Sequence, residues 1–199
     1  MTRALALAVL LASCAPEFTT SSRRLAQGAP PPREPVAERR ASYFDAAATR
    51  IRREWHVLVV AGGATVLHGK DVQYFGDGHL EHEREYDHGD PAGNWRAWWP
   101  NGNPRMEASF GSSEPLPMRW WHENGRLSCE GLARNGSKEG AWTFFHESGA
   151  KSAEGAYAAG KREGRWSSWS EAGSPIESIE YRDDLRIGRV PAGSGENPQ

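Results

Sequence analysis

Histidine and glutamate side chains gather in one short stretch of the chain, where metal binding is the first chemistry to consider. His79 and His82 stand beside Glu81 and Glu83, and His88 follows a little further on. The two nearer histidines are three residues apart, so in a strand their side chains point to opposite faces. Their spacing also differs from that of the zinc hydrolase motifs. The sequence therefore predicts no metal site.

A glutamate recurs at a regular interval further along the chain, at Glu83, Glu107, Glu130 and Glu154. Paired carboxylates serve as acid and base in glycoside hydrolysis, but regular recurrence favours a solvated or cross-strand-paired row. The Gly-x-Ser-x-Gly and P-loop patterns are absent from the sequence. We therefore predict that the protein is not an enzyme, with no catalytic residue and no cofactor.

The other reactive side chains have simpler interpretations. Cys129 is more typical of a small packed residue than of a nucleophile. His122 and His146 occupy the same place in a repeated pattern, each followed by glutamate, which indicates a structural surface role. The 24 Lys and Arg residues nearly balance 26 Asp and Glu, which argues against a broadly basic surface for nucleic acid.

The first residues have the pattern of an export signal. A short positive start precedes an apolar run over 4–12, which as a helix spans roughly 14 Å and is too short to cross a bilayer. Leu11-Ala12-Ser13-Cys14 resembles the lipobox of bacterial lipoproteins, in which cleavage precedes acylation of the cysteine. The resemblance implies a signal peptide over 1–13, lipidation of Cys14 and a cell-envelope location. Because no Asp follows Cys14, it favours the outer membrane in a bacterium that has two.

The next residues are expected to form a tether and a cap. Residues 14–42 are rich in proline and poor in large apolar side chains, which predicts a disordered spacer. Phe44, Ala48, Ile51 and Trp55 then recur at helical spacing, with Asp45 as N-cap. This predicts one short helix that covers the end of the units behind it.

Two apolar runs follow this helix, over 57–60 and 65–67, and the Gly62-Gly63 pair between them predicts a hairpin. The expected organisation is therefore a capping helix and hairpin over 43–68, repeats over 69–188 and a disordered tail over 189–199.

A repeat occupies the middle of the chain. Five segments share one frame, with anchor glycines spaced by 24, 23, 24 and 24 residues. An aromatic residue stands four positions before every anchor, and a residue that is usually Trp stands seven before it. We call these sets the minus-four and minus-seven columns. The anchors are Gly78, Gly102, Gly125, Gly149 and Gly173; the minus-four column is Tyr74, Trp98, Trp121, Phe145 and Trp169; the minus-seven column is Asp71, Trp95, Met118, Trp142 and Trp166.

The spacing of the glycines indicates where the turns and strands lie. Asn-Gly and Asp-Gly pairs at the anchors predict hairpin turns, and a second turn is expected at Gly-x-x-x-Gly, as in 89–93, 136–140 and 160–164. Runs of about seven to ten residues between turns suit strands. The sequence therefore predicts an all-β antiparallel meander of stacked hairpins with a period of about 24 residues, plus the one N-terminal helix.

Stacking would bury the aromatic columns. Burying one Trp removes roughly 150–250 Å² from water, a gain of about 4–6 kcal/mol before conformational entropy is counted. The two columns differ by three positions, so a regular strand places them on opposite faces. Either both faces carry aromatic rings, or a bulge redirects one column.

The third interval is irregular. Residues 111–119 lose one position and the turn glycines, and they gain Pro115 and Pro117, which cannot donate to a ladder. Two interpretations stay open: a distorted loop without further meaning, or the place where a partner docks.

The segments 93–102, 140–149 and 164–173 share the pattern Gly-x-Trp-x-x-aromatic, ending in glycine. They resemble the bacterial variant of the MORN repeat. The resemblance implies a β-hairpin repeat that serves as an interaction scaffold, and many bacterial proteins of this kind are labelled antitoxins. An exported lipoprotein fits poorly with an antitoxin of a cytoplasmic toxin.

We therefore expect a membrane-anchored envelope lipoprotein whose repeats bind an unidentified protein partner, with no nucleic acid bound. One alternative is binding of cell-wall glycan or a choline-type ligand by the aromatic rings. The other is an antitoxin-like or immunity-like role.

Overall fold

The computed structural model describes residues 35–189. The predicted signal peptide, Cys14 and most of the predicted tether and tail lie outside the described residues. Among the residues described, no helix is long and apolar enough to span a membrane.

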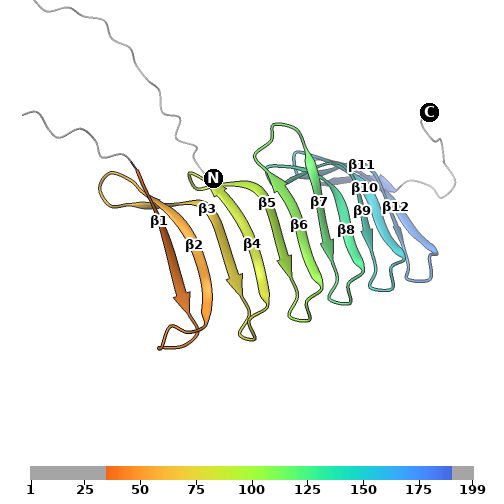
Figure 1. Cartoon of the computed structure of the whole chain (residues 1–199). Coiled ribbons are helices and arrows are strands. Elements are labelled where there is room, and N and C mark those ends of the chain that lie inside the picture. The colour runs from red at the N-terminus through yellow and green to blue at the C-terminus, as the bar shows by residue number, and fades with distance from the viewer. Residues whose placement is uncertain (1–34, 190–199) are drawn as a thin grey trace, which may run out of the picture. The chain divides into compact units, whose positions relative to one another are not determined.

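The described chain folds into one antiparallel sheet of thirteen strands, in which every strand pairs with its neighbour in sequence. The strands follow one another in chain order and bend along their length (Figure 1). The predicted all-β meander is confirmed. The strands are β1 Val36–Tyr43, β2 Ile51–Val59, β3 Thr65–Tyr74, β4 Leu80–Asp87, β5 Asp90–Trp98, β6 Pro104–Phe110, β7 Leu116–Trp121, β8 Leu127–Arg134, β9 Ser137–Phe145, β10 Lys151–Ala158, β11 Lys161–Trp169, β12 Pro175–Arg182 and β13 Leu185–Arg189.

The predicted N-terminal helix is wrong: residues 35–189 contain no helix. Residues 44–50 form a loop, and β2 takes up the remainder of the expected helix. The Asp45 carboxylate closes this loop by accepting hydrogen bonds from the backbone N–H and hydroxyl of Thr49 and from the N–H of Arg50. Asp45 therefore does cap backbone N–H groups, but those of a loop. Pairing of β2 with a strand on each side outweighs the local helical spacing.

Residues 36–42, assigned by the sequence to the tether, instead belong to β1. This strand pairs with β2 from Val36↔Val59 to Tyr43↔Ile51. The hairpin expected between 57 and 67 is present as β2 and β3, closed by a hydrogen bond from Val60 N–H to the Ala64 carbonyl at 2.9 Å.

Turns of two kinds alternate along the sheet. All five anchor glycines lie in hairpin turns with positive φ; at Gly102, for example, the N–H donates to the carbonyl of Trp99 at 2.9 Å. At the opposite ends of the strands, two-residue turns such as Asn135-Gly136 have positive φ at both residues, as type I′ turns require.

The second glycine of each expected Gly-x-x-x-Gly turn has another place. Gly93, Gly140 and Gly164 lie within β5, β9 and β11, with φ between 59° and 67°, where the pairing register shifts. Each one therefore forms part of a β-bulge rather than of the turn. The bulge brings the following tryptophan over the preceding strand.

The indole N–H of that tryptophan bonds to a carbonyl near the bulge. Trp95, Trp142 and Trp166 donate to the carbonyls of Glu85, Leu132 and Ala156 at 2.9, 2.8 and 3.1 Å. A bulge disrupts the backbone hydrogen bonds of the ladder locally. Each indole N–H therefore supplies a hydrogen-bond partner for a carbonyl next to the bulge.

Large rings from alternate strand positions form the core along one face of the sheet, which we call the aromatic face. Trp142 is 1% exposed and its ring lies 5.8 Å from Trp120 and 6.1 Å from Tyr157, while Trp166 lies 5.0 Å from Tyr157 and 6.5 Å from Tyr181. These rings form a continuous series from β7 to β12. The adjacent minus-four residues, such as Phe145 beside Phe144, therefore point to the opposite face. The first interpretation therefore holds, because aromatic residues occupy both faces; the bulges at Gly93, Gly140 and Gly164 precede the minus-seven residues and do not bring the two columns to one face.

Two glycines of the preceding strands make room for the most buried indoles. Gly131 is in register with Trp142, and Gly155 lies against the Trp166 ring where the register between β10 and β11 shifts. A Cβ added at Gly155 would lie 2.3 Å from Trp166 Cδ2, and one at Gly131 would lie 2.4 Å from Trp142 Cδ2. Neither glycine was singled out by the sequence analysis.

We predict that Gly155→Ala destabilises the sheet by about 1–3 kcal/mol, because the methyl group displaces the Trp166 ring from a packed position. Gly188→Ala is the matched control, since a Cβ there meets no atom within 4 Å. Urea unfolding followed by tryptophan emission measures both. Equal midpoints for the two variants would show that the close approach has no energetic weight.

Candidate functional site

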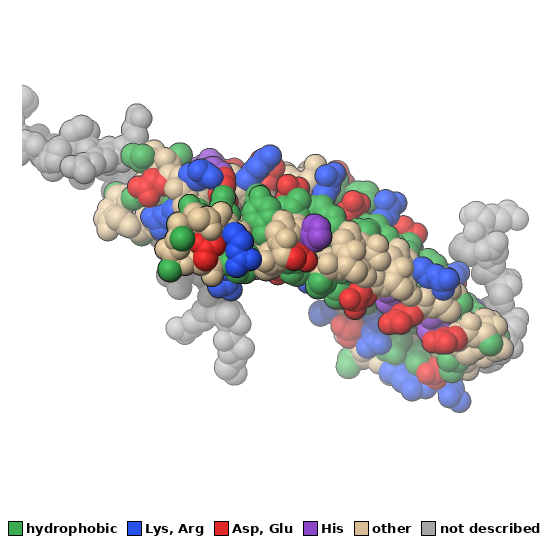
Figure 2. Space-filling model, turned by 60° about the horizontal axis from the view of Figure 1, so that its bottom comes forward, with side chains coloured by type: hydrophobic (Ala, Val, Ile, Leu, Met, Phe, Trp, Pro, Cys, Tyr) green, Lys and Arg blue, Asp and Glu red, His purple; other side chains and the backbone are tan. Residues whose placement is uncertain are grey.

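The aromatic face is open at its C-terminal end. A groove of about 410 Å³ lies over β9–β12, and rings of Phe144, Tyr157, Trp166 and Tyr181 line it together with polar and charged residues. The other lining residues are Ala153, Arg162, Ser167, Ser168, Glu177 and Ile179. On the face shown in Figure 2, acidic and basic side chains are interspersed around apolar ones rather than gathered by sign.

Cations lie against these rings. The Lys138 ammonium is 4.6–5.0 Å from the ring centroids of Trp142, Phe144 and Tyr157, and burial lowers its pKa. The Arg162 guanidinium lies 4.0 Å from the centroid of Tyr181. Ring faces attract positive charge through their quadrupole, so the aromatic face is suited to contact with basic side chains.

A carboxylate takes the place of tryptophan in the first repeat. Asp71 of the minus-seven column is 2% exposed. The Arg53 guanidinium donates two hydrogen bonds to its carboxylate, from Nε to Oδ1 at 2.7 Å and from Nη2 to Oδ2 at 3.0 Å. His82 Nε2 is 3.8 Å from Oδ2, beyond hydrogen-bond distance. Burial raises the pKa of Asp71, but the neighbouring His82 and Arg53 outweigh it and hold the pKa at about 2. The group is a buried structural ion pair.

The histidines of the repeat link adjacent hairpins. His122 Nε2 donates to the carbonyl of Phe145 and His146 Nε2 to that of Trp169, each at 2.9 Å. Trp99, at the equivalent position, donates through its indole N–H to the Trp121 carbonyl at 3.0 Å. This hydrogen-bonded series accords with the structural role expected for both histidines.

The recurring glutamates lie on the face opposite to the aromatic face. Glu130 accepts a hydrogen bond from Arg119 Nε at 3.1 Å across the β7–β8 pair, and Glu107 is in register with Arg96 and Arg119. Glu83, Glu107 and Glu130 are thus opposite arginines on adjacent strands. Glu154 instead pairs with Lys151 of its own strand. Cys129 lies 8% exposed in the core, and burial raises the pKa of its thiol, which favours the unreactive form.

The irregular third interval still provides a strand. Pairing between β6 and β7 covers only three positions, Met106↔Trp120 to Ala108↔Met118, while β7 pairs fully with β8. Met118 is 5% exposed and continues the core between Trp95 and Trp142. Residues 111–113 line a cavity of about 510 Å³ with Asp90, Phe110 and Asn135.

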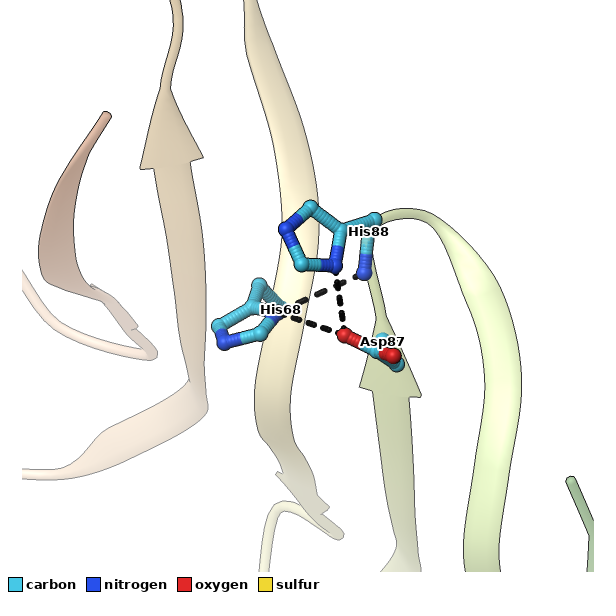
Figure 3. A group of neighbouring side chains, drawn as sticks. All are labelled: His68, Asp87 and His88. Carbon is cyan, nitrogen blue, oxygen red and sulfur yellow. Dashed lines mark hydrogen bonds and ion pairs between the residues drawn. The ribbon is translucent and has the colours of Figure 1, made fainter. Parts of the chain in front are cut away.

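The histidines named by the sequence do not come together. His82 is buried beside Asp71, whereas His79 is exposed in a turn beside Asp77. His88 instead meets His68 and Asp87, and the three side chains converge where the β4–β5 turn lies against β3 (Figure 3). The sequence did contain a sign that this group would form. His68 lies ten residues before the anchor Gly78 and His88 ten residues after it, so a hairpin turn at Gly78 brings the two histidines together.

In comparisons with known proteins, no family model matches this chain and no curated protein matches it. The resemblance to the MORN repeat therefore stays a prediction from the sequence.

We predict that stability falls steeply as the pH drops from about 4 to 2. Because the folded-state pKa of Asp71 is lowered from 3.8 to about 2, its stabilisation is present above the unfolded-state pKa and disappears towards the folded-state pKa, an effect of about 2 kcal/mol. Asp71→Asn should weaken this pH dependence and lower the stability at neutral pH. Thermal unfolding at a series of pH values measures both effects.

Asp184→Asn is the control for that series. Asp184 pairs with Arg162 on the surface, where ion pairs contribute little, and Asn tolerates its positive φ of 67°. If both variants change the acid transition equally, the buried Arg53–Asp71 pair has no special part in it.

Proposed function

We propose that the sheet is a protein-interaction scaffold displayed in the bacterial envelope by a lipid on Cys14. The observation that carries the proposal is the aromatic face. Within residues 35–189 all strands belong to one sheet, with no helix or second sheet to cover its rings.

The composition of the groove supports a protein partner. Tryptophan, tyrosine and arginine are the residues that most often dominate binding energy at protein interfaces, and Tyr157, Arg162, Trp166 and Tyr181 all line this groove. The four side chains come from three adjacent strands, β10, β11 and β12. Their backbones are held by the ladder, so little order has to be gained on binding.

The envelope location rests on sequence. The residues before Cys14 resemble a lipoprotein signal, and the Pro-rich residues after it suit a spacer between membrane and sheet. The resemblance of the hairpins to the MORN repeat also favours a scaffold.

We predict that capture of the full-length protein from detergent-solubilised envelope recovers one stoichiometric protein, and that Ser168→Arg abolishes this. Ser168 lines the groove, so the long cation would occupy it. Thr143→Arg is the matched control, because Thr143 precedes Phe144 and points to the opposite face, in register with Glu130 and Glu154. Mass spectrometry of the captured material measures the outcome.

Three results would contradict the proposal. Equal recovery with both variants would place any partner away from the groove. Failure to recover a partner, together with a change in tryptophan emission on adding choline or peptidoglycan fragments, would favour the ligand-binding alternative. Recovery of a toxin would favour the antitoxin-like alternative.

A separate prediction concerns the anchor. Labelled palmitate should enter the wild-type protein and not Cys14→Ala, because only the acylated cysteine would hold the lipid. Cys129→Ala should keep the label, since Cys129 is buried in the core. Labelling that persists in Cys14→Ala would refute lipidation at this position.

A further inference from the structure

We propose that His68, Asp87 and His88 bind a divalent transition-metal ion such as Zn²⁺. The donor set consists of two imidazole nitrogens and one carboxylate oxygen, whose atoms all lie within 4.8 Å of one another. Imidazole suits zinc, copper and nickel, whereas magnesium and calcium prefer oxygen ligands alone. The proposal is independent of the scaffold function.

The separations of the donor atoms are close to those in a metal site. Zinc binds His nitrogen and carboxylate oxygen at about 2.0–2.2 Å, so neighbouring ligand atoms of a tetrahedron lie about 3.3–3.6 Å apart. His68 Nδ1 lies 3.3 Å from Asp87 Oδ1. His88 Nδ1 lies 2.6 Å from the same oxygen, at hydrogen-bond distance. A metal ion replaces the proton between these two atoms, and a small widening of the His88–Asp87 pair completes the site.

The lone pair of His68 Nδ1 already faces the turn. The backbone N–H of His88 donates to Nδ1 at 3.3 Å, so this nitrogen acts as an acceptor. The Gly89 N–H donates to the Leu67 carbonyl at 2.7 Å and holds the turn against β3. The backbone thus positions the three donors, and a bound metal ion displaces the long His88 N–H bond to Nδ1 as well as the hydrogen bond between His88 Nδ1 and Asp87.

Other repeats show that the fold does not need these side chains. At the equivalent place in β9 and β11, Glu139 and Glu163 accept the backbone N–H of Ala159 and Asp183, each at 3.0 Å. The residue equivalent to His88 in the β8–β9 turn is Asn135, which has almost the same φ. The turn therefore needs one acceptor and one residue that tolerates positive φ, and two histidines with an aspartate exceed that need.

The site is open to solvent on one side. The side chains of Asp87 and His88 are each 67% exposed and that of His68 is 36% exposed. The remaining coordination positions are thus accessible to water or to a ligand side chain from another protein. Because water reaches the bound ion, we expect the affinity of this site for Zn²⁺ to be modest.

The test is to titrate the full-length protein with Zn²⁺ alone at neutral pH and to measure binding by isothermal titration calorimetry. We expect one ion per chain. His68→Gln keeps an acceptor for the His88 N–H, and His88→Asn copies the β8–β9 turn; each should weaken binding by at least about tenfold. His79→Gln, which changes an exposed histidine outside the group, should bind as the wild type does.

Two further measurements keep the outcome interpretable. Unchanged thermal unfolding of both variants without metal shows that the fold is intact, and the visible spectrum of added Co²⁺ distinguishes nitrogen and oxygen ligation from thiolate ligation at a cysteine. Absence of zinc binding to the wild type, thiolate ligation, or equal affinity in the His68→Gln/His88→Asn double variant would overturn the proposal.

Discussion

Trp142 packs against Gly131 of the preceding strand, and its indole N–H donates to the carbonyl of the next residue, Leu132. Trp166 repeats the arrangement with Gly155 and Ala156. One side chain thereby joins two strands through both apolar burial and a hydrogen bond. Because an isolated hairpin is marginal in water, each unit depends on its neighbour for the cover of its ring, and the stability of the sheet is shared along its length.

The substitutions within the minus-seven column show that neither the ring packing nor the indole hydrogen bond is required in every unit. Met118 keeps the apolar contact and continues the core, but it has no N–H to offer a carbonyl. Asp71 lacks both properties, and the guanidinium of Arg53 compensates for its buried charge. A buried charge is tolerated when it is paired and hydrogen-bonded, so the first repeat replaces ring packing by an ion pair at the same register position.

Two regions of different chemistry follow from the same repeat. The groove over β9–β12 arises where rings line one face and small residues such as Ala153 and Ser168 leave space between them. The His68–Asp87–His88 group lies nearer the N-terminal end of the described sheet, where the type I′ turn between β4 and β5 lies against β3. The first region depends on side chains that alternate along strands, and the second depends on a turn that reaches the neighbouring hairpin.

The sequence alone determined the period, the strand-turn alternation, the anchor turns and the aromatic columns, because glycine tolerance of positive φ and the burial of rings are local properties repeated five times. It did not determine the fate of residues 36–55: residues 36–42, expected in the tether, pair with β2 as β1, and the helical spacing of 44–55 is outweighed by the pairing of β2 with β1 and β3. Only the tertiary structure placed Gly140 in a bulge and His68 beside His88. These outcomes depend on which atoms of adjacent hairpins meet, and a one-residue change in register alters that set completely.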